Sequence, residues 1–262
     1  MQRLDSGMDI EVSQIEKVVR EASSLLTRDG FSVTGKGSRE NIVTSSDLAV
    51  QHFLTARLGE LLPGSGFLCE EEDLSDIAGH RDVWIIDPID GTANYARGIA
   101  SCCISVALER NGVPEAGVVF SPWRNEMYTA VRGKGARCNG KVINVSGRPF
   151  EEGILFTAMS TYRKEFARKC SDIIYDIYME SNDIRRTGSA AVELCMMAAG
   201  KAELYFEMRL MPWDYAAAGI PNVGTYMIVG LVGANFLFEL GFNLILSPII
   251  VRLLRISKNL RW

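Results

Sequence analysis

Histidine and paired cysteines are the first features that this sequence lacks. It has only two histidines, His52 and His80, and neither has a ligand neighbour at useful spacing. Its six cysteines show none of the paired spacings of zinc-binding modules. A histidine-rich zinc site and a zinc finger are therefore excluded. We interpret the cysteines as reduced, mostly buried thiols and expect a cytoplasmic protein.

Excess positive charge, repeats and a secretory leader are lacking as well. The 28 Lys and Arg residues are outnumbered by 32 Asp and Glu residues, and the net charge is −4. A mildly acidic chain argues against nucleic acid as a partner. The first residues show no charged-then-apolar signal pattern, and no low-complexity linker interrupts the chain. With 262 residues the chain can bury a large core as one or two domains.

Apolar periodicity predicts a mixture of helices and strands. Apolar residues at three-and-four spacing indicate helices over 8–29 and 46–61. Apolar segments separated by turn signals such as Asn111-Gly112 predict an antiparallel meander. The other elements that we expect are strands over 67–69, 83–86, 102–110, 113–121, 125–131, 153–159 and 204–206, a helix over 162–180, an extended segment over 184–186, and helices that begin at 188–189 and at 213.

The most informative segment runs from Trp84 to Thr92 and gathers several oxygen donors. It begins as a buried strand that we expect to end before Pro88, because proline lacks a backbone donor and fixes φ. Gly91 permits positive φ and completes a tight turn. Hard oxygen ligands suit Mg²⁺, although Asp-Pro and Asp-Gly pairs are also typical of ordinary turns. The donors are the carboxylates of Asp87 and Asp90, the carbonyl of Ile89 and the hydroxyl of Thr92.

Three further acids and one lysine stand at the ends of expected elements. Asp47 opens the second helix and Asp214 opens a later one, and capping alone would explain either carboxylate. Glu70 begins a run of four acids, which is most often a solvated loop, but the strand before it favours an inward Glu70. Lys36 lies in a polar segment, where it is either a solvated loop lysine or a contact for a phosphate or a metal-bound water.

Taken in order, these segments resemble the signature of the inositol monophosphatase family, a group of Mg²⁺-dependent, lithium-sensitive phosphatases. The resemblance covers about residues 8–219, and its five ordered blocks are more specific together than any one alone. It implies an α/β (α+β) chain folded as a layered αβαβα sandwich, with the metal site where its halves meet. The blocks are Lys36 with Asn41 to Asp47, Phe67 to Glu71, Trp84 to Thr92, Gly188 to Ala191, and Glu207 with Trp213 to Gly219.

The resemblance also implies a metal site with two or three Mg²⁺ ions. Glu70 and Asp87 would bind the first ion together with the carbonyl of Ile89. Asp87, Asp90 and Asp214 would bind the second ion, and Glu70 would contact a loosely held third one.

Catalytic and substrate-binding roles follow from the same resemblance. Glu70 and Thr92 would orient the attacking water, with Asp47 beside the metals. Thr92 is not a nucleophile in this interpretation, because no base adjoins it. The substrate-binding residues would be Gly91 and Thr92 for the phosphate, Asp90, and Ala190 and Glu207 for a sugar-like alcohol.

Residues 220–262 depart from the family and form a separate, hydrophobic and basic-ended tail after the phosphatase-like region 1–219. From residue 223 to 251 the only charge is Glu239, and this length spans a bilayer. Arg252, Arg255 and Lys258 follow, as in a cytosolic anchor. We expect membrane contact through 223–251, with a membrane helix that tethers the protein; the alternative is a buried helix and strand of the core.

The sequence therefore predicts a Mg²⁺-dependent phosphomonoesterase that hydrolyses myo-inositol monophosphate or a similar polyol phosphate by a metal-activated water. Its partner would be a small phosphate ester, and the family resemblance implies a homodimer. Two alternatives stay open. One is a catalytically impaired, membrane-associated binder of polyol phosphates. The other is a relative that acts on fructose bisphosphate or on nucleotide 3′-phosphates.

Overall fold

The structure is a computed structural model. It describes residues 10–218 apart from 28, 37–40, 72–76 and 160–163. The tail 220–262, with its expected membrane segment, lies outside the described residues. Among the helices that the structure does describe, none has both the length and the apolar character needed to cross a bilayer.

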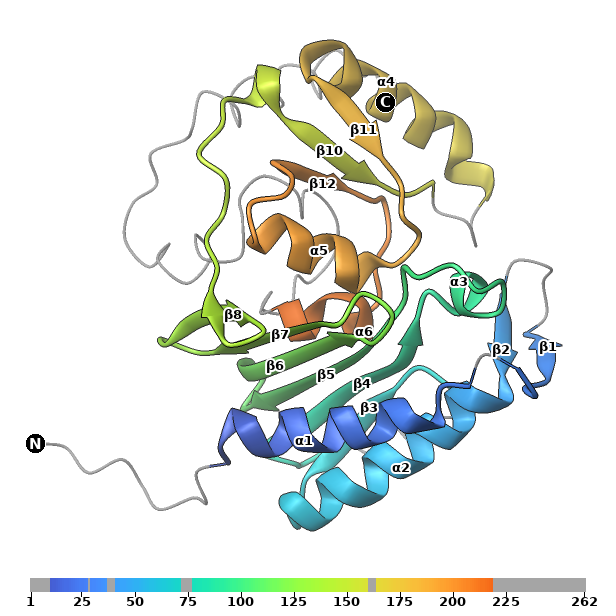
Figure 1. The fold of residues 1–262 in the computed structure, drawn as a ribbon, viewed down its shortest axis with the longest axis vertical. Coiled ribbons are helices and arrows are strands. Elements are labelled where there is room, and N and C mark those ends of the chain that lie inside the picture. The colour runs from blue at the N-terminus through green and yellow to red at the C-terminus, as the bar shows by residue number, and fades with distance from the viewer. Residues whose placement is uncertain (1–9, 28, 37–40, 72–76, 160–163, 219–262) are drawn as a thin grey trace, which may run out of the picture.

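The largest sheet of the described chain has seven strands (Figure 1). Its strands lie in chain order, β3 pairs in parallel with β4, and every later pair is antiparallel. Asn111 and Gly112 join two of these strands with φ of 53° and 74°, as a two-residue hairpin requires. The predicted meander is confirmed. The strands are β3 (Gly66–Cys69), β4 (Asp82–Asp90), β5 (Cys103–Arg110), β6 (Val113–Ser121), β7 (Glu126–Val131), β8 (Gly135–Cys138) and β9 (Lys141–Val142).

A second sheet has three parallel strands in the order β11 (Asp183–Arg185), β10 (Ile154–Thr157) and β12 (Leu204–Phe206). Alternate residues of β10 point to opposite faces. Leu155 packs with one set of helical residues and Phe156 with another. This sheet is therefore covered on both sides, which is usual for parallel strands. A small ribbon of β1 (Val33–Gly35) and β2 (Ile42–Thr44) lies apart from both sheets.

Helices fill the three remaining layers. The helices α1 (Val12–Ala22) and α2 (Ser45–Leu61) cover the outer face of the large sheet, as Figure 1 shows. Between the two sheets lie α5 (Ala190–Ala198) and the short α6 (Pro212–Tyr215), which continues as a 3₁₀ turn, Ala216–Ala218. The helix α4 (Ala167–Glu180) covers the far side of the small sheet. The layers therefore follow the predicted αβαβα order.

Two local expectations are corrected by the structure. The strand that we expected to end before Pro88 continues to Asp90, because a bulge absorbs the residue that cannot pair. The second helix begins at Ser45 with Thr44 as its N-cap, so Asp47 is the third helical residue and not the cap itself. Its carboxylate still satisfies the helix end, since it accepts the Thr44 N–H at 2.7 Å.

Gly117 allows the end of the described chain to lie directly on the large sheet. A Cβ added at Gly117 of β6 would stand 2.1 Å from the carbonyl oxygen of Ala217. Only a residue without a side chain permits this approach. The contact fixes the turn that follows α6, and α6 carries Asp214.

We predict that Gly117→Ala lowers the free energy of unfolding by about 1–3 kcal/mol, because backbone must move to accept the methyl group. Urea denaturation followed by circular dichroism measures this change. Gly147→Ala is the matched control: Gly147 is exposed, and its added Cβ would meet nothing within 4 Å. Equal stability of the two variants would contradict the prediction.

Candidate metal centre

A β-bulge aims two carboxylates of β4 at the same space. Asp87 pairs with Ser105 of β5, and Asp90 pairs with Cys103, so three steps on one strand match two on the other. Residues two apart on a strand share a face. Asp87 and Asp90 therefore point to the same side of the sheet, although their spacing in a regular strand would separate them. The intervening Ile89 packs into a separate small core with its side chain 1% exposed.

Asp214 joins this pair from the start of α6. Asp87, Asp90 and Asp214 each offer a carboxylate oxygen, and these three atoms lie within 4.8 Å of one another. Asp214 accepts the Met211 N–H at 2.6 Å. Ser105 Oγ, which lies 3.3 Å from the Trp213 carbonyl oxygen, ties α6 to β5. Asp214 is the third residue of α6 and not its cap, which is Met211, and its carboxylate both satisfies the helix end and lies in the cluster.

The N-terminus of α5 holds Asp90. Asp90 Oδ2 accepts hydrogen bonds from Ser189 Oγ at 2.5 Å and from the Ala191 N–H at 2.7 Å. The first turn of a helix presents N–H donors that have no partner within the helix and that suit an anion. In this protein the anion bound by these donors is the Asp90 carboxylate. Its negative charge is stabilised by the positive end of the helix dipole.

Glu70 and Lys36 approach the cluster from the other side. Glu70 directly follows β3, and its N–H donates to the Ile86 carbonyl at 3.2 Å, which keeps it beside β4. Lys36 Nζ forms an ion pair with Glu71 and lies 3.8 Å from Glu70 Oε1. Lys36 is therefore not a solvated loop lysine. Glu71, with its side chain fully buried, is the acid that Lys36 contacts most closely.

Thr92 and Asp47 form a hydrogen-bonded pair beside these acids. Thr92, at the first position of α3 (Thr92–Tyr95), places Oγ1 3.2 Å from Asp47 Oδ1 and 3.0 Å from the Ile89 carbonyl oxygen. Asp47 is fully buried, and its other oxygen accepts both Thr44 N–H and Thr44 Oγ1. The hydroxyl hydrogen of Thr92 is directed at acceptors, so its lone pairs can accept a hydrogen bond from water.

Electrostatics at this centre favour a bound cation. Burial raises the pKa of Asp87 well above its usual value, and the charges of Glu70, Asp90 and Asp214 raise it further. Burial and the charge of Glu71 raise the pKa of Glu70 to about 7. Asp87 Oδ1 is buried and has no hydrogen-bond partner among the described residues. An all-oxygen, acidic donor set with such an atom fits a hard divalent cation such as Mg²⁺.

The expected substrate residues border the same centre. Gly91, with φ of 88°, caps α3 next to Thr92. Ala190 is the first residue of α5. Glu207 follows β12 and accepts a hydrogen bond from Tyr205 Oη at 2.6 Å. Burial raises the pKa of Glu207 to about 7, and the charge of Asp90 contributes to the rise.

Sequence reasoning missed three residues that organise the centre. Ser105 anchors α6, while Asn94 and Glu193 both contact the segment before α5. Asn94 Nδ2 donates to the carbonyls of Ser101 and Thr187, and Glu193 accepts backbone N–H groups of that segment. The one available signal was polarity in an apolar setting, since Glu193 lies in the apolar run Ala190–Ala198.

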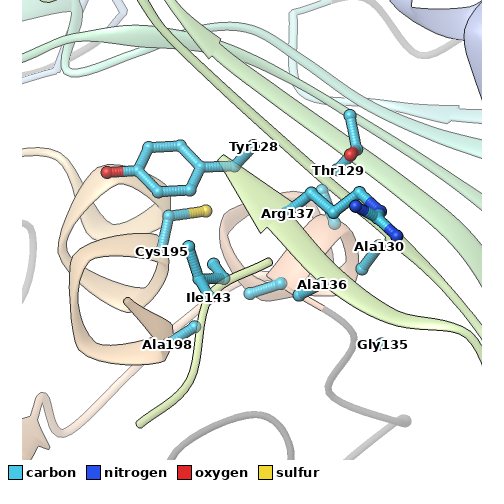
Figure 2. Close-up of a pocket in the computed structure, with 11 residues that line it drawn as sticks. Tyr128, Thr129, Ala130, Gly135, Ala136, Arg137, Ile143, Cys195 and Ala198 are labelled. Atoms are coloured by element: carbon cyan, nitrogen blue, oxygen red, sulfur yellow. The ribbon is translucent and has the colours of Figure 1, made fainter. Parts of the chain in front are cut away.

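A cavity of about 30 Å³ lies away from the acids, where β7 and β8 face α5 (Figure 2). Figure 2 shows Tyr128 and Cys195 on one side of it and Arg137 on the other. Thr129, Gly135, Ile143 and alanines of β7, β8, α5 and the turn after α6 complete its lining. None of the carboxylates described above lines this cavity, and it has room for about one water molecule. It is therefore distinct from the acidic centre.

An oxygen-only acidic centre where strands end and helices begin is typical of α/β proteins that use divalent cations on phosphates. Comparison with known proteins agrees with this class. The profile of the inositol monophosphatase family matches residues 6–220. The chain therefore belongs to the inositol monophosphatase family.

Individual relatives cover most of the chain. The Nus factor SuhB of Xylella fastidiosa is 37% identical over 215 residues, which are 79% of this chain and 76% of the relative. Inositol monophosphatase 1 of Bos taurus is 34% identical over 216 residues, again 79% and 76% of the two chains.

Solved structures agree with the fold. The extragenic suppressor protein suhB of Bartonella henselae matches 79% of this chain and 81% of its own, with 31% identity and a TM-score of 0.74. An IMPase/NADP phosphatase solved with Mg²⁺ and phosphate matches 79% and 75%, with 26% identity and a TM-score of 0.65.

We predict that Asp87→Asn makes the metal-free protein more stable at pH 8. The acids of the centre have pKa values above their unfolded values, so folding binds protons and stability falls as the pH rises. For Glu70 the loss runs from about pH 4.5 to about 7. The stabilisation by Asp87→Asn should therefore be larger at pH 8 than at pH 5, measured as urea midpoints with a chelator.

Asp82→Asn is the matched control on the same strand. Burial alone would raise the pKa of Asp82, but its hydrogen bonds with Arg110 and Arg81 outweigh burial and lower it. Removing this charge should destabilise the protein at pH 8. If both substitutions shift the midpoint in the same direction, repulsion at the centre is not the cause.

Proposed function

We propose that the chain is a Mg²⁺-dependent phosphomonoesterase that hydrolyses myo-inositol monophosphate or a similar polyol phosphate. The observation that carries the proposal is the convergence of Asp87, Asp90 and Asp214 within 4.8 Å, with a buried oxygen of Asp87 lacking a partner among the described residues. Family membership and the relative solved with Mg²⁺ and phosphate support it. The catalytic unit is residues 1–219.

The residues that would hold the cations are those at the end of β4 and their neighbours. Asp87 and Glu70, with the carbonyl of Ile89, form one set of ligands, and Asp87, Asp90 and Asp214 form the other. A third, weaker position lies at Glu70. When bound, Mg²⁺ would neutralise the phosphate oxygens, lower the pKa of a water and stabilise the leaving oxygen.

The protein's own contribution is to position and deprotonate the attacking water. Thr92 Oγ1 accepts a hydrogen bond from water and directs its own hydrogen at Asp47 Oδ1, 3.2 Å away. Glu70, which follows β3 beside Asp87, would accept the proton of this water. The water oxygen forms a bond to phosphorus as the bond from phosphorus to the alcohol oxygen breaks, and the alcohol oxygen takes up a proton from solvent. The N–H groups of Gly91 and Thr92 hold the phosphate, and Lys36 lies near enough to contact it or a coordinated water.

Substrate choice would depend on the alcohol side of the centre. Ala190 and Glu207 face the leaving group, and the Glu207 carboxylate, oriented by Tyr205 Oη, accepts hydrogen bonds from hydroxyls. A polyol has such hydroxyls, and an aryl phosphate does not. The relatives that carry the names inositol monophosphatase and IMPase/NADP phosphatase support a hydroxyl-rich substrate.

We predict that Asp87→Asn abolishes Mg²⁺-dependent phosphate release from myo-inositol 1-phosphate, because a carboxylate shared by both ligand sets is lost. Malachite-green detection of phosphate, with the full-length protein in mild detergent, measures the rate. Asn139→Gly is the control, since Asn139 lies in a hairpin turn with φ of 49°. Near-wild-type turnover in Asp87→Asn would refute the metal assignment. Substrate binding without release by the wild type would instead assign a binding role.

We predict that Glu207→Ala raises KM for myo-inositol 1-phosphate by about tenfold, because a charged acceptor worth about 1.5 kcal/mol is lost. The KM for p-nitrophenyl phosphate should change much less, since this ester has no ring hydroxyls. Parallel kinetics on the two substrates measure the difference. An equal change in KM for both esters would show that Glu207 does not recognise the alcohol part of the substrate.

A further inference from the structure

The backbone of Thr187, in the segment between β11 and α5, is held by hydrogen bonds from two sides. Its N–H donates to Glu193 Oε1, which also accepts the Gly188 N–H at 3.3 Å. Its carbonyl accepts a hydrogen bond from Asn94 Nδ2 at 2.7 Å, and the same nitrogen lies 2.6 Å from the Ser101 carbonyl. Side chains from α5 and α3 thus hold the backbone N–H and the backbone carbonyl of Thr187.

The segment that contains Thr187 leads directly to the hydrogen-bond donors that orient Asp90. Ser189 Oγ and the Ala191 N–H, which hold Asp90 Oδ2, come two and four residues after Thr187. A shift of the segment would move both donors. Asp90 would then be free to turn its carboxylate, and the geometry of the cluster would loosen.

Two glycines with positive φ allow the backbone segments to approach closely enough for these hydrogen bonds. Gly188 has φ of 86°, and a Cβ there would stand 3.0 Å from Asn94 Nδ2. Gly91 has φ of 88°, and its Cβ would meet the Ser101 carbonyl at 2.9 Å and the Gly188 carbonyl at 3.2 Å. The two segments therefore approach as closely as glycine allows. Glu193 is only 1% exposed, so its carboxylate is not a surface charge that merely favours a helix start.

We propose that Asn94 and Glu193 are positioning residues that hold the segment 187–191 so that Asp90 is oriented for metal binding. The inference rests on the proposed function in taking Asp90 as a metal ligand. Residues that orient ligands in this way typically change metal affinity by about 10–100-fold when they are lost. A measurement of folding stability alone would not reveal this effect, whereas a measurement of metal affinity would.

The test is Mn²⁺ binding to the full-length protein, measured by electron paramagnetic resonance of the free ion. Asn94→Ala should weaken Mn²⁺ binding by about tenfold or more. Asn139→Gly is the matched control: the Asn139 amide also bridges two backbone groups, at 2.8 and 2.9 Å, and glycine suits its positive φ. Equal affinities in the two variants would overturn the proposal.

A second pair of variants keeps the test independent of Asn94. Glu193→Gln retains an acceptor for the two N–H groups and should bind Mn²⁺ nearly as the wild type does, whereas Glu193→Leu should lose about tenfold. Glu203→Gln is the control for a partly buried Glu that accepts a backbone N–H elsewhere, from Ile154 at 2.7 Å. A loss in Glu193→Leu that thermal melts explain by unfolding, with no loss in Asn94→Ala, would overturn the proposal.

The outcomes separate this proposal from the proposed function. A wild type that binds Mn²⁺ but releases no phosphate would refute the phosphatase, and the affinities of the variants would still decide the roles of Asn94 and Glu193. A folded wild type that binds no Mn²⁺ would overturn both.

Discussion

Repulsion among buried carboxylates is the constraint on which the rest of this structure depends. Two unit charges 4.8 Å apart repel by roughly 3.5 kcal/mol at an effective dielectric constant of 20. Asp87, Asp90 and Asp214 form three such pairs when all are ionised. A helix N-terminus typically offsets only about 0.3–1 kcal/mol of this, and up to about 2 kcal/mol when partly buried. The fold therefore cannot neutralise the centre with its own dipoles. Protons or cations must do so. Burial raises the pKa of all three acids, and the charges of neighbouring acids raise the pKa of Asp87 and Asp214 further.

The fold spreads the task of holding these acids over several helix starts. Asp90 accepts donors at the start of α5, Asp214 accepts the N–H of the residue that precedes α6, and Asp47 does the same at α2. Each carboxylate thus uses one oxygen to hold its own helix start, and the other oxygen of Asp47 accepts a hydrogen bond from Thr92 Oγ1. The opposite end of β4 shows the contrasting solution, since Asp82 is paired with Arg81 and Arg110. One strand therefore carries an acid neutralised by two arginines, Asp82, and two buried acids with raised pKa values, Asp87 and Asp90. Such a division is the usual compromise between stability and function.

Local sequence predicted the elements and the acidic residues but not how they meet. Hairpin turns such as Asn111-Gly112, the periodic helices and the strand end before Glu70 have local signatures, and they were predicted. The bulge between Asp87 and Asp90 has none, because it is defined by pairing with β5, and proline suggested a strand end instead. The approach of Gly117 to Ala217 and the bond from Asn94 to Thr187 join residues about 100 positions apart. Hydrophobic periodicity carries no information about such long-range contacts. The sequence therefore predicted the acidic residues of the centre but not the residues that position them.

The contacts that build the centre are also those that join the two sheets. Asp90 to Ser189, Asn94 to Thr187 and Ser105 to Trp213 each connect the large sheet or its loops with an element packed between the sheets. Neither the large sheet nor the elements that follow it hold the full set of acids, so assembly of the chain and assembly of the centre are one event. A cation that binds only the assembled centre must therefore stabilise the packing of α5 and α6 on the large sheet, by linkage. In its absence, the repulsion concentrated where these elements meet opposes that packing. The strongest coupling between ligand and fold is therefore expected at the α5 and α6 junctions and not in α1 or α2.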